Sequence, residues 1–405
     1  MSSQASNSGS AKPAPFLSPS VDFAVGYRGE GRVEDLSRGG AGVLRLDGRV
    51  VFIPFTAPGD RVLFEVTALE KRWAQGRLIQ LLESSPNRVD PRCPVFGRCG
   101  GCQWQHLPYE FQWKTKLSGA QHALSRVGLH PEDPTWLEFP AQQVWEYRNR
   151  IQLRGDDQGM GFFEAGSRKR VSISRCDIAR PELNAVLPAL RAAGKSRFES
   201  HPFEYKVEIE VLSNGQVREF WNSRHAAGGF RQVHDEQNRV LQEAVARLLE
   251  WQRPLDSAEH LLDLYGGAGN LSRPLGSRFS RIDCVDIGAP RAALDGAPSS
   301  IHFHPMAVGK WLKKTHPKAE PPSVRVRAIL DPPREGLGEE ASDIVEGLKK
   351  WRVQEIVAVG CDADSWARDL ARLGRAGWTL KKAGALDLFP QTPHVESLVL
   401  LVRKN

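Results

Sequence analysis

Four short apolar runs in the second half of the chain, each ending in glycine or aspartate, constrain the fold more than any other feature. They read HLLDLYGG, RIDCVDIG, VRAILDPP and EIVAVGCD, beginning at residues 260, 281, 326 and 355. Residues 235–251 have the pattern of a helix, and SLVLLV near the C-terminus is expected to form the last strand. Strands that alternate with helical segments predict a parallel sheet with crossover connections, so residues 226–405 are expected to be an α/β domain.

The first of these runs continues into a glycine-rich turn, LLDLYGGAGNLS, that has the form of a cofactor loop. Asn270 in this turn is a candidate cap for a following helix. Asp286 ends the next predicted strand, where a carboxylate accepts hydrogen bonds from ribose hydroxyls. The pattern fits NAD, FAD or S-adenosylmethionine. The missing G-x-G-x-x-G spacing and the acidic Asp263 before the turn favour S-adenosylmethionine, and a glycine turn without a ligand is the alternative.

Two further residues stand at the carboxyl ends of predicted strands, Asp331 in LDPPR and Cys361 in VGCD. Ligands of open α/β sheets bind at this edge. We therefore expect Asp286, Asp331 and Cys361 to converge on one crevice. Taken singly, an aspartate before two prolines is an ordinary turn residue and a cysteine at a strand end is an ordinary buried side chain.

Three of the six cysteines cluster as Cys93-x5-Cys99-Gly-Gly-Cys102. If Cys176 supplies a fourth thiolate, the four make an all-sulfur site for an iron–sulfur cluster or a structural zinc ion. Only one C-x2-C pair is present, and this three-plus-one arrangement favours the cluster over zinc. Three unrelated buried thiols are the remaining alternative, and Cys284, inside an apolar strand, is expected to be core.

The first half of the chain divides into segments that differ in composition and residue pattern. Residues 1–18 are rich in Ser, Ala, Pro and Gly and are expected to be a disordered tail. Residues 19–84 predict a small β-barrel of the oligonucleotide-binding kind, because Asp47-Gly48 joins two β-rich runs, although another small β module would show the same pattern. Residues 85–225 are expected to form a central β domain with the cysteine loop, and 107–130 read as helical.

Composition is that of a globular protein, with 40% hydrophobic residues and no apolar stretch long enough to span a membrane. The net charge of +7 permits a polyanionic partner without requiring one. The first 20 residues lack the pattern of a secretory signal, so a cytoplasmic protein without a membrane partner is expected.

Taken together, the motifs resemble the RNA uracil-5-methyltransferase family over nearly the whole chain. CPVFGRCGGCQWQH is similar to the family's iron–sulfur loop, RCDIARPELN to its fourth-cysteine segment, and GGFRQVH to its F-x-Q-x-N element. DLYGGAGN resembles its cofactor loop, DPPREG its aspartate motif, VGCDADSWARDL its nucleophile motif and LDLFPQTPHVES its base motif. Residues 19–84 resemble a TRAM domain, the barrel attached to the members that act on large-subunit ribosomal RNA.

The resemblance implies a multidomain α/β enzyme with a Rossmann-like class I methyltransferase domain, against which helix 107–130 would pack. Cys361 would be the nucleophile and Glu396 the base. The residues implied at the S-adenosylmethionine site are Gln232, Tyr265, Asn270, Asp286 and Asp331, and Cys93, Cys99, Cys102 and Cys176 would hold a 4Fe-4S cluster. The expected product is 5-methyluridine in RNA, ribosomal RNA rather than transfer RNA, formed by a monomer.

The chain departs from the family pattern at four positions. Gly360 and Ala363 flank Cys361 where the family has Ser and Pro, His234 replaces the asparagine of F-x-Q-x-N, and no acid stands near Met306. We expect an active enzyme with weakened cofactor affinity. The competing hypotheses are a transfer RNA enzyme, an RNA-binding assembly protein with a degenerate cofactor pocket, and an iron–sulfur oxidoreductase unrelated to RNA.

Overall fold

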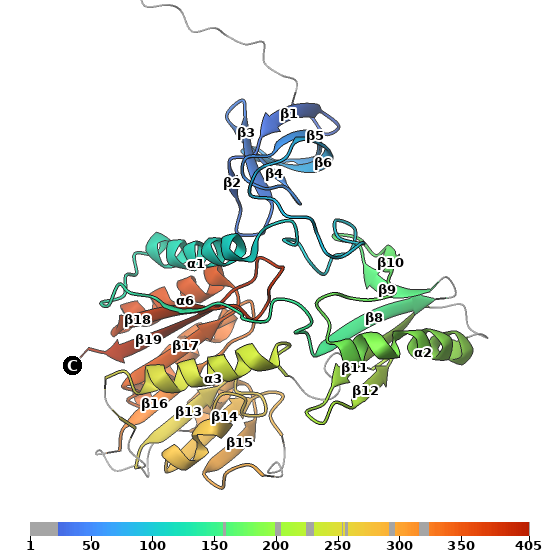
Figure 1. Cartoon of the computed structure of the whole chain (residues 1–405). Helices are drawn as coiled ribbons and strands as arrows, with labels where there is room; N and C mark the ends of the chain where they lie inside the picture. The colour runs from blue at the N-terminus through green and yellow to red at the C-terminus, as the bar shows by residue number, and fades with distance from the viewer. Residues whose placement is uncertain are drawn as a thin grey trace, which may run out of the picture. The chain divides into compact units, whose positions relative to one another are not determined.

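The computed structural model describes residues 23–156, 159–198, 204–223, 231–252, 254–255, 258–290, 296–315 and 324–404 (Figure 1). The tail expected to be disordered, residues 1–18, lies outside these ranges. The chain forms two compact units. The first contains residues 1–37 and 41–86, and the second contains 38–40 and 87–405.

The first unit is a six-stranded sheet in the order β1-β5-β6-β4-β3-β2. Its strands are β1 (Arg28–Arg32), β2 (Asp35–Leu36), β3 (Gly42–Leu46), β4 (Arg49–Ile53), β5 (Arg61–Leu69) and β6 (Trp73–Glu83). The Asp47-Gly48 pair makes the β3–β4 turn with positive φ at both residues, as a two-residue hairpin turn requires. Irregular pairing bends β5 and β6, and β1 contacts β3, so the sheet curls around its apolar core as a small barrel.

A five-stranded antiparallel sheet lies in the second unit, in the order β10-β9-β8-β11-β12. Its elements are β8 (Arg150–Asp156), β9 (Gly159–Phe163), β10 (Arg170–Ser172), α2 (Pro181–Phe198), β11 (Tyr205–Val211) and β12 (Val217–Trp221). Leu183, Leu187 and Leu190 of α2 cover one face of this sheet and form a core with strands β8 and β11.

The largest sheet of the second unit has eight strands in the order β15-β14-β13-β16-β17-β19-β18-β7. They are β7 (Leu137–Phe139), β13 (His260–Leu264), β14 (Arg281–Asp286), β15 (Ile301–Pro305), β16 (Val326–Leu330), β17 (Glu355–Gly360), β18 (Trp378–Leu386) and β19 (Glu396–Arg403). Strands β13 to β17 are parallel. The four apolar runs predicted this for β13, β14, β16 and β17, and β15 joins them at the edge, whereas β19 is antiparallel to both β17 and β18.

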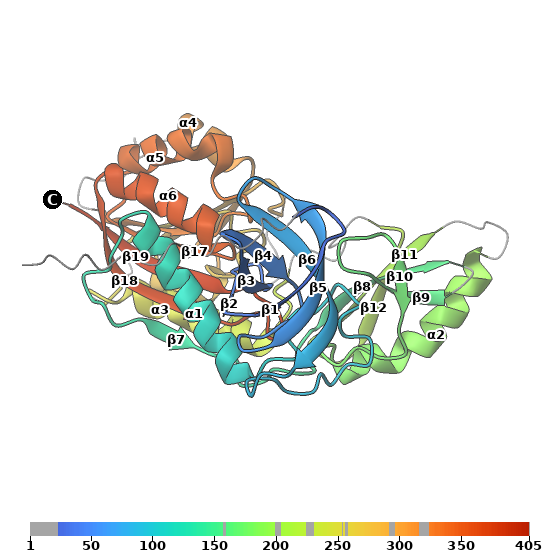
Figure 2. The ribbon, with the colours of Figure 1, turned by 90° about the horizontal axis from the view of Figure 1, so that it is seen from above.

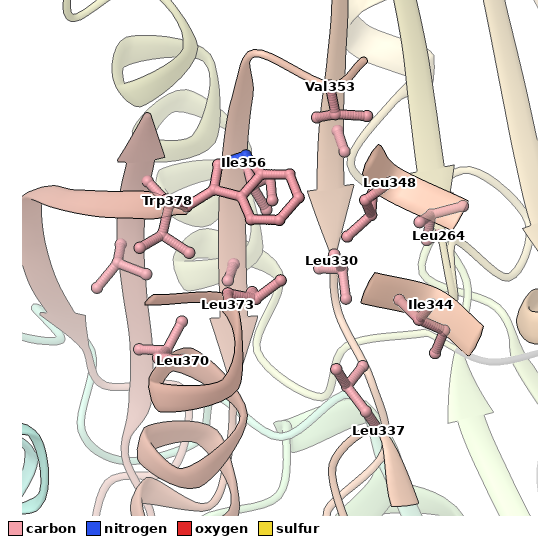
Figure 3. Close-up of a cluster of buried hydrophobic side chains, with 14 of the residues drawn as sticks. Leu264, Leu330, Leu337, Ile344, Leu348, Val353, Ile356, Leu370, Leu373 and Trp378 are labelled. Atoms are coloured by element: carbon pink, nitrogen blue, oxygen red, sulfur yellow. The ribbon is translucent and has the colours of Figure 1, made fainter. Parts of the chain in front are cut away.

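Helices cover both faces of this sheet. α1 (Tyr109–Arg126), α4 (Val308–Lys314), α5 (Ala341–Lys350) and α6 (Ala363–Arg375) lie side by side over one face (Figure 2), and α3 (Asp235–Leu249) packs on the other. Figure 3 shows the core beneath the first group, where Trp378 and Ile356 point toward leucines of α5 and α6. α1 contacts α6, and β7 pairs with β18, so the segment before the five-stranded sheet belongs to the large sheet.

Two local predictions were wrong. The segment after the glycine turn is a short 3-10 helix, η1 (Arg273–Arg278). Pro274 lies in its first turn, where proline is tolerated, and Gly276 inside it disfavours a longer α-helix. Asn270 does not cap it, because its side chain exchanges hydrogen bonds with Asn238 of α3 instead. A second 3-10 turn, η2 (Gly338–Glu340), precedes α5. Within the described ranges, no helix combines the length and the apolar character needed to cross a membrane.

Candidate active site

The strand register of the large sheet brings Asp331, Cys361 and Glu396 to one edge. Asp331 follows β16 and Cys361 follows β17, and these two strands are parallel neighbours. Strand β19 runs the other way beside β17 and pairs Ser397 with Gly360, so Glu396, its first residue, lies next to Cys361. The reversal of the last strand therefore places an acid that is distant in sequence at the carboxyl end of the parallel strands.

The environment keeps protons on both Cys361 and Glu396. Burial raises the pKa of Cys361 to about 12, with further increases from the charges of Glu396 and Asp331. Burial also raises the pKa of Glu396 well above its usual value, and the charge of Asp331 adds to this. The Arg334 guanidinium opposes both shifts. A buried carboxyl with a raised pKa is suited to exchange a proton near neutral pH.

The loop that carries Cys361 is held without the proline that the family has at Ala363. Asp362 caps α6 by accepting a hydrogen bond from the Ser365 N–H at 2.9 Å. The Ser365 hydroxyl donates to the Arg334 carbonyl at 2.7 Å, which ties this loop to the loop of Asp331. A Cβ at Gly360 would lie 2.6 Å from Trp366 Cδ1, so glycine is required for the indole to pack there.

The glycine turn is shaped by backbone conformations that most residues avoid. Tyr265 has φ +65°, Gly267 +56° and Gly269 +80°. A non-glycine residue in this region is uncommon and is typical of functional sites. A Cβ at Gly266 would meet the Asp263 carboxylate at 2.4 Å, so the turn closes tightly over that side chain.

Three carboxyl groups, those of Asp263, Asp286 and Asp331, face the same region. Burial raises the pKa of Asp263 to about 6 and that of Asp331 to about 7, and in each case the charge of Asp286 adds to the increase. Asp263 accepts hydrogen bonds from Ser272 and Cys284 at one oxygen, while its Oδ1 has no partner among the described residues. Such a cluster favours a ligand that brings positive charge.

The remaining predicted cofactor residue, Gln232, lies just before α3, close in sequence to His234. Gln232 is buried, and its carbonyl accepts from Asn149 at 2.9 Å, whereas residues 224–230 are outside the described ranges. His234 caps α3 by accepting from the Gln237 N–H, and its Nε2 lies 2.9 Å from the Gln143 carbonyl oxygen. Burial lowers the pKa of His234, which keeps it neutral for capping. Met306 packs against the core beneath α4, α5 and α6, and it donates its N–H to the Asp286 carbonyl at 3.1 Å.

The four cysteines predicted to act together line one cavity of about 420 Å³. Burial raises the pKa of Cys102 to about 12 and that of Cys176 to about 11, and the charges of neighbouring cysteines contribute to both. Side-chain amides hold two of these cysteines by their backbone N–H groups. The Cys93 N–H donates to Gln105 Oε1 at 3.0 Å, and the Cys176 N–H donates to Asn184 Oδ1 at 2.8 Å. Cys284 is fully buried in β14, in agreement with a role in the core.

The spacing of these thiols bears on what they could bind. In the part of the chain that the structure describes, no group of three or more His, Cys, Asp or Glu side chains is arranged to hold a metal ion. The four thiols surround a cavity instead of meeting at a point. An all-sulfur donor set around a cavity of this size fits a polynuclear group better than a single zinc ion.

Two features were not assigned from the sequence. Arg334 is the cation that acts on Cys361 and Glu396, and DPPREG contains it without marking it. The packing of Trp366 on Gly360 is a second such feature, since nothing in the spacing VGCDADSW indicates which residue the indole contacts.

Two protein-family models match this chain. The TRAM-domain model of tRNA (uracil(54)-C(5))-methyltransferase matches residues 29–87, and the tRNA (Uracil-5-)-methyltransferase model matches residues 324–404. An uncharacterized RNA methyltransferase of Bdellovibrio bacteriovorus is 29% identical over 376 residues, which are 91% of this chain and 93% of that protein. One from Halalkalibacterium halodurans is 27% identical and covers 92% of this chain and 96% of its own.

A solved structure has the same fold. The Pyrococcus abyssi tRNA (uracil-54, C5)-methyltransferase, in complex with S-adenosyl-L-homocysteine, aligns with a TM-score of 0.70 at 22% identity and covers 92% of this chain and 99% of its own. The matched segments include the barrel and the strands that carry Asp331, Cys361 and Glu396. The chain belongs to the RNA uracil-5-methyltransferase family and is an S-adenosylmethionine-dependent enzyme of that family.

Proposed function

We propose that this enzyme methylates C5 of a uridine through a covalent bond between Cys361 Sγ and uracil C6. Adding sulfur at C6 makes C5 nucleophilic enough to take the methyl group, which S-adenosylmethionine supplies as a sulfonium. Glu396 then removes the C5 proton as the C6–S bond breaks and the thiolate leaves. The observation that carries this proposal is the pairing of Gly360 with Ser397, which brings Glu396 next to Cys361.

The protonation of Cys361 and Glu396 bears on these two roles. Cys361 must lose its proton before it attacks, and Glu396 must be ionised before it accepts one. Arg334 stabilises both anions, and a cationic ligand near Asp331 would do the same by neutralising that carboxylate. The thiolate would therefore form once the site is filled, which protects the resting thiol from oxidation.

We assign the S-adenosylmethionine site to the glycine turn and the carboxylates beside it. Asp286 ends β14, and at that position a carboxylate would accept hydrogen bonds from ribose hydroxyls. Tyr265, Asn270 and Gln232 would complete the site, and Asp331 would lie between the cofactor and the uracil. The unpartnered Asp263 Oδ1 and the raised pKa values fit a cationic cofactor.

For the four-cysteine cavity we propose a 4Fe-4S cluster bound by Cys93, Cys99, Cys102 and Cys176. The cluster would join the cysteine loop covalently to the segment before α2 and so fix two parts of the chain that are distant in sequence. After anaerobic purification, we expect iron and acid-labile sulfide in equal amounts. Zinc without sulfide would contradict this assignment.

RNA is the proposed partner of the barrel. Trp73, 37% exposed, packs edge-to-face on Phe52 with ring centroids 6.0 Å apart. Lys71 and Arg72 precede Trp73 in the β5–β6 turn, and Arg49 donates to the Lys71 carbonyl. Aromatic rings beside cations suit stacking on unpaired bases and contact with phosphates.

Two RNA classes are candidates for a monomeric enzyme. The resemblance of the barrel to the TRAM domain of ribosomal RNA enzymes favours large-subunit ribosomal RNA. Transfer RNA is the second candidate, because the matching TRAM model and the solved structure of the same fold both carry the names of transfer RNA enzymes.

The test combines labelled S-adenosylmethionine with both RNA classes from cells that lack 5-methyluridine. Nucleoside mass spectrometry should find labelled 5-methyluridine in one fraction. Cys361→Ala should abolish the product, and Glu396→Gln should trap RNA on the protein in a denaturing gel. The double variant is the control and should trap none. Product from Cys361→Ala would overturn the covalent mechanism, and no binding of S-adenosylmethionine to the wild-type chain would favour an RNA-binding protein with a degenerate pocket.

A further inference from the structure

The loop between β18 and β19, residues 387–395, ends at Glu396 and has no regular secondary structure. Its middle residue, Gln391, has φ +70°, which residues with a Cβ rarely adopt. Such a conformation persists only where the surroundings impose it. The position of the proposed base therefore depends on the contacts that other segments make with this loop.

The turn after the cysteines makes the first of these contacts. The N–H groups of Gln103 and Trp104, directly after Cys102, both donate to the Gln391 carbonyl, at 3.1 and 3.0 Å. The Gln103 side chain donates to the Gly100 carbonyl at 2.9 Å, so the same short turn also shapes the segment from Cys99 to Cys102. We call residues 387–395 the base loop and residues 103–104 the cysteine turn. One carbonyl of the base loop is thus held by two N–H groups of the cysteine turn.

Gln112 of α1 makes the second contact and joins the two segments. Its Oε1 accepts from the Gln391 N–H at 3.0 Å, and its Nε2 lies 3.0 Å from Gln391 Oε1. The same Nε2 donates to the carbonyls of Trp104 at 3.1 Å and Leu107 at 2.9 Å. Both glutamines are buried, with 0% and 3% exposure, so each lost bond would leave an unsatisfied polar group.

Two further side chains hold the same loop from earlier parts of the chain. The Tyr147 hydroxyl donates to the Pro390 carbonyl at 3.0 Å, and its ring packs in a cluster with Cys102 and Cys176. Lys116 of α1 donates to Asp387 at 2.7 Å and to the Phe389 carbonyl at 3.0 Å. The base loop is therefore fixed from the side of the cysteine turn and α1.

We propose that Gln112 is a positioning residue for Glu396 and acts through Gln391. The hydrogen bonds between these two glutamines, called the amide joint below, make the position of Glu396 depend on the cysteine turn. The inference rests on the proposed roles of Cys361 and Glu396. It predicts that loosening the joint slows removal of the C5 proton and leaves the earlier addition and methyl transfer intact.

The test uses the full chain with Gln112→Leu and, as a milder variant, Gln391→Leu. The second variant keeps the hydrogen bonds of the Gln391 backbone and loses those of its side chain to Gln112 and to the Val144 carbonyl. A misplaced base should lower kcat by about 100-fold, as small displacements of catalytic groups do, with KM for both substrates changed less than about threefold. Covalent RNA–protein adduct should accumulate. RNA carrying deuterium at uridine C5 should show a kinetic isotope effect larger than that of the wild type, because proton removal becomes rate-limiting.

The control is Leu187→Ala, which weakens the core of the five-stranded sheet without touching the joint. It should lower stability without adduct or isotope effect. If both glutamine variants fold and show neither signal while Glu396→Gln traps adduct, the joint is refuted and the proposed function stands. If Glu396→Gln traps none, the proposed function itself fails.

Hydrogen exchange in residues 387–396 should rise in Cys99→Ser, and unchanged exchange would contradict the dependence on the cysteine turn.

Discussion

Replacing Gly360 with serine, the residue that the family has at this position, tests how Cys361, the proposed nucleophile, is held. The new Cβ would lie 2.6 Å from Trp366 Cδ1 and 2.9 Å from its Cβ and Cγ, all closer than real contacts allow. Trp366 is 3% exposed and cannot swing into solvent. Overpacking of this kind costs about 1–3 kcal/mol. Because Cys361 is the next residue, the displacement should also lower kcat by about 10- to 100-fold.

The measurement is a double-mutant cycle by urea unfolding, with Gly360→Ser, Trp366→Ala and the double variant. Tryptophan fluorescence reports mainly on the second unit, because ten of the eleven tryptophans lie there. Serine should cost less in the Trp366→Ala background, which removes the contacts with Cδ1 and Cγ and leaves only the 2.9 Å contact with the Cβ, and we expect a coupling of about 1 kcal/mol. Gly374→Ser, on the helix α6 that also carries Trp366, is the matched control, since its Cβ would meet Leu129 only at 3.5 Å. Additive effects of the two substitutions would refute the packing argument.

Three other predictions concern charge. Lys116→Met should cost about 3–5 kcal/mol in urea unfolding, because it leaves the Asp387 carboxylate buried without its cation; a loss below about 1 kcal/mol would contradict this. Asp286→Ala should weaken S-adenosylmethionine about 10- to 100-fold by calorimetry, through lost hydrogen bonds to a charged acceptor, with RNA affinity unchanged. Ionised carboxylates attract the cationic cofactor, and the pKa values are about 7 for Asp331 and about 6 for Asp263. Binding should therefore tighten from about pH 5.5 to about pH 7.5 and release protons, and Asp331→Asn should flatten the profile; a wild-type affinity independent of pH would refute this sign.

Four strands of the parallel part of the large sheet, β13, β14, β16 and β17, follow from sequence because they are mostly buried and end in a turn residue. That pattern is enough to place Asp286, Asp331 and Cys361 at one edge of the sheet. It is not enough for Glu396. An acid at the start of a strand is ordinarily solvated, and only the reversed direction of β19, which is a tertiary property, brings it to the same edge.

Short or locally ambiguous segments could not be predicted for different reasons. Strand β7 has three residues, too few for a period to be visible, and its pairing with β18 joins positions that are far apart in sequence. Asn270 follows glycines as a helix cap would, yet α3 supplies partners for its amide that the local sequence does not indicate. In both cases a long-range contact overrides the local pattern.

The departures from the family pattern acquire a physical explanation once their neighbours are known. Gly360 gives room to Trp366, Asp362 and Ser365 anchor the loop that lacks a proline at Ala363, and His234 caps α3 in place of an asparagine. Three of the four departures, those at Gly360, Ala363 and His234, thus have a local structural explanation, and nothing in the structure explains the missing acid near Met306. Because packing and capping hold the loop of Cys361, the proposed nucleophile, and the start of α3, these three departures are no reason to expect a disordered site.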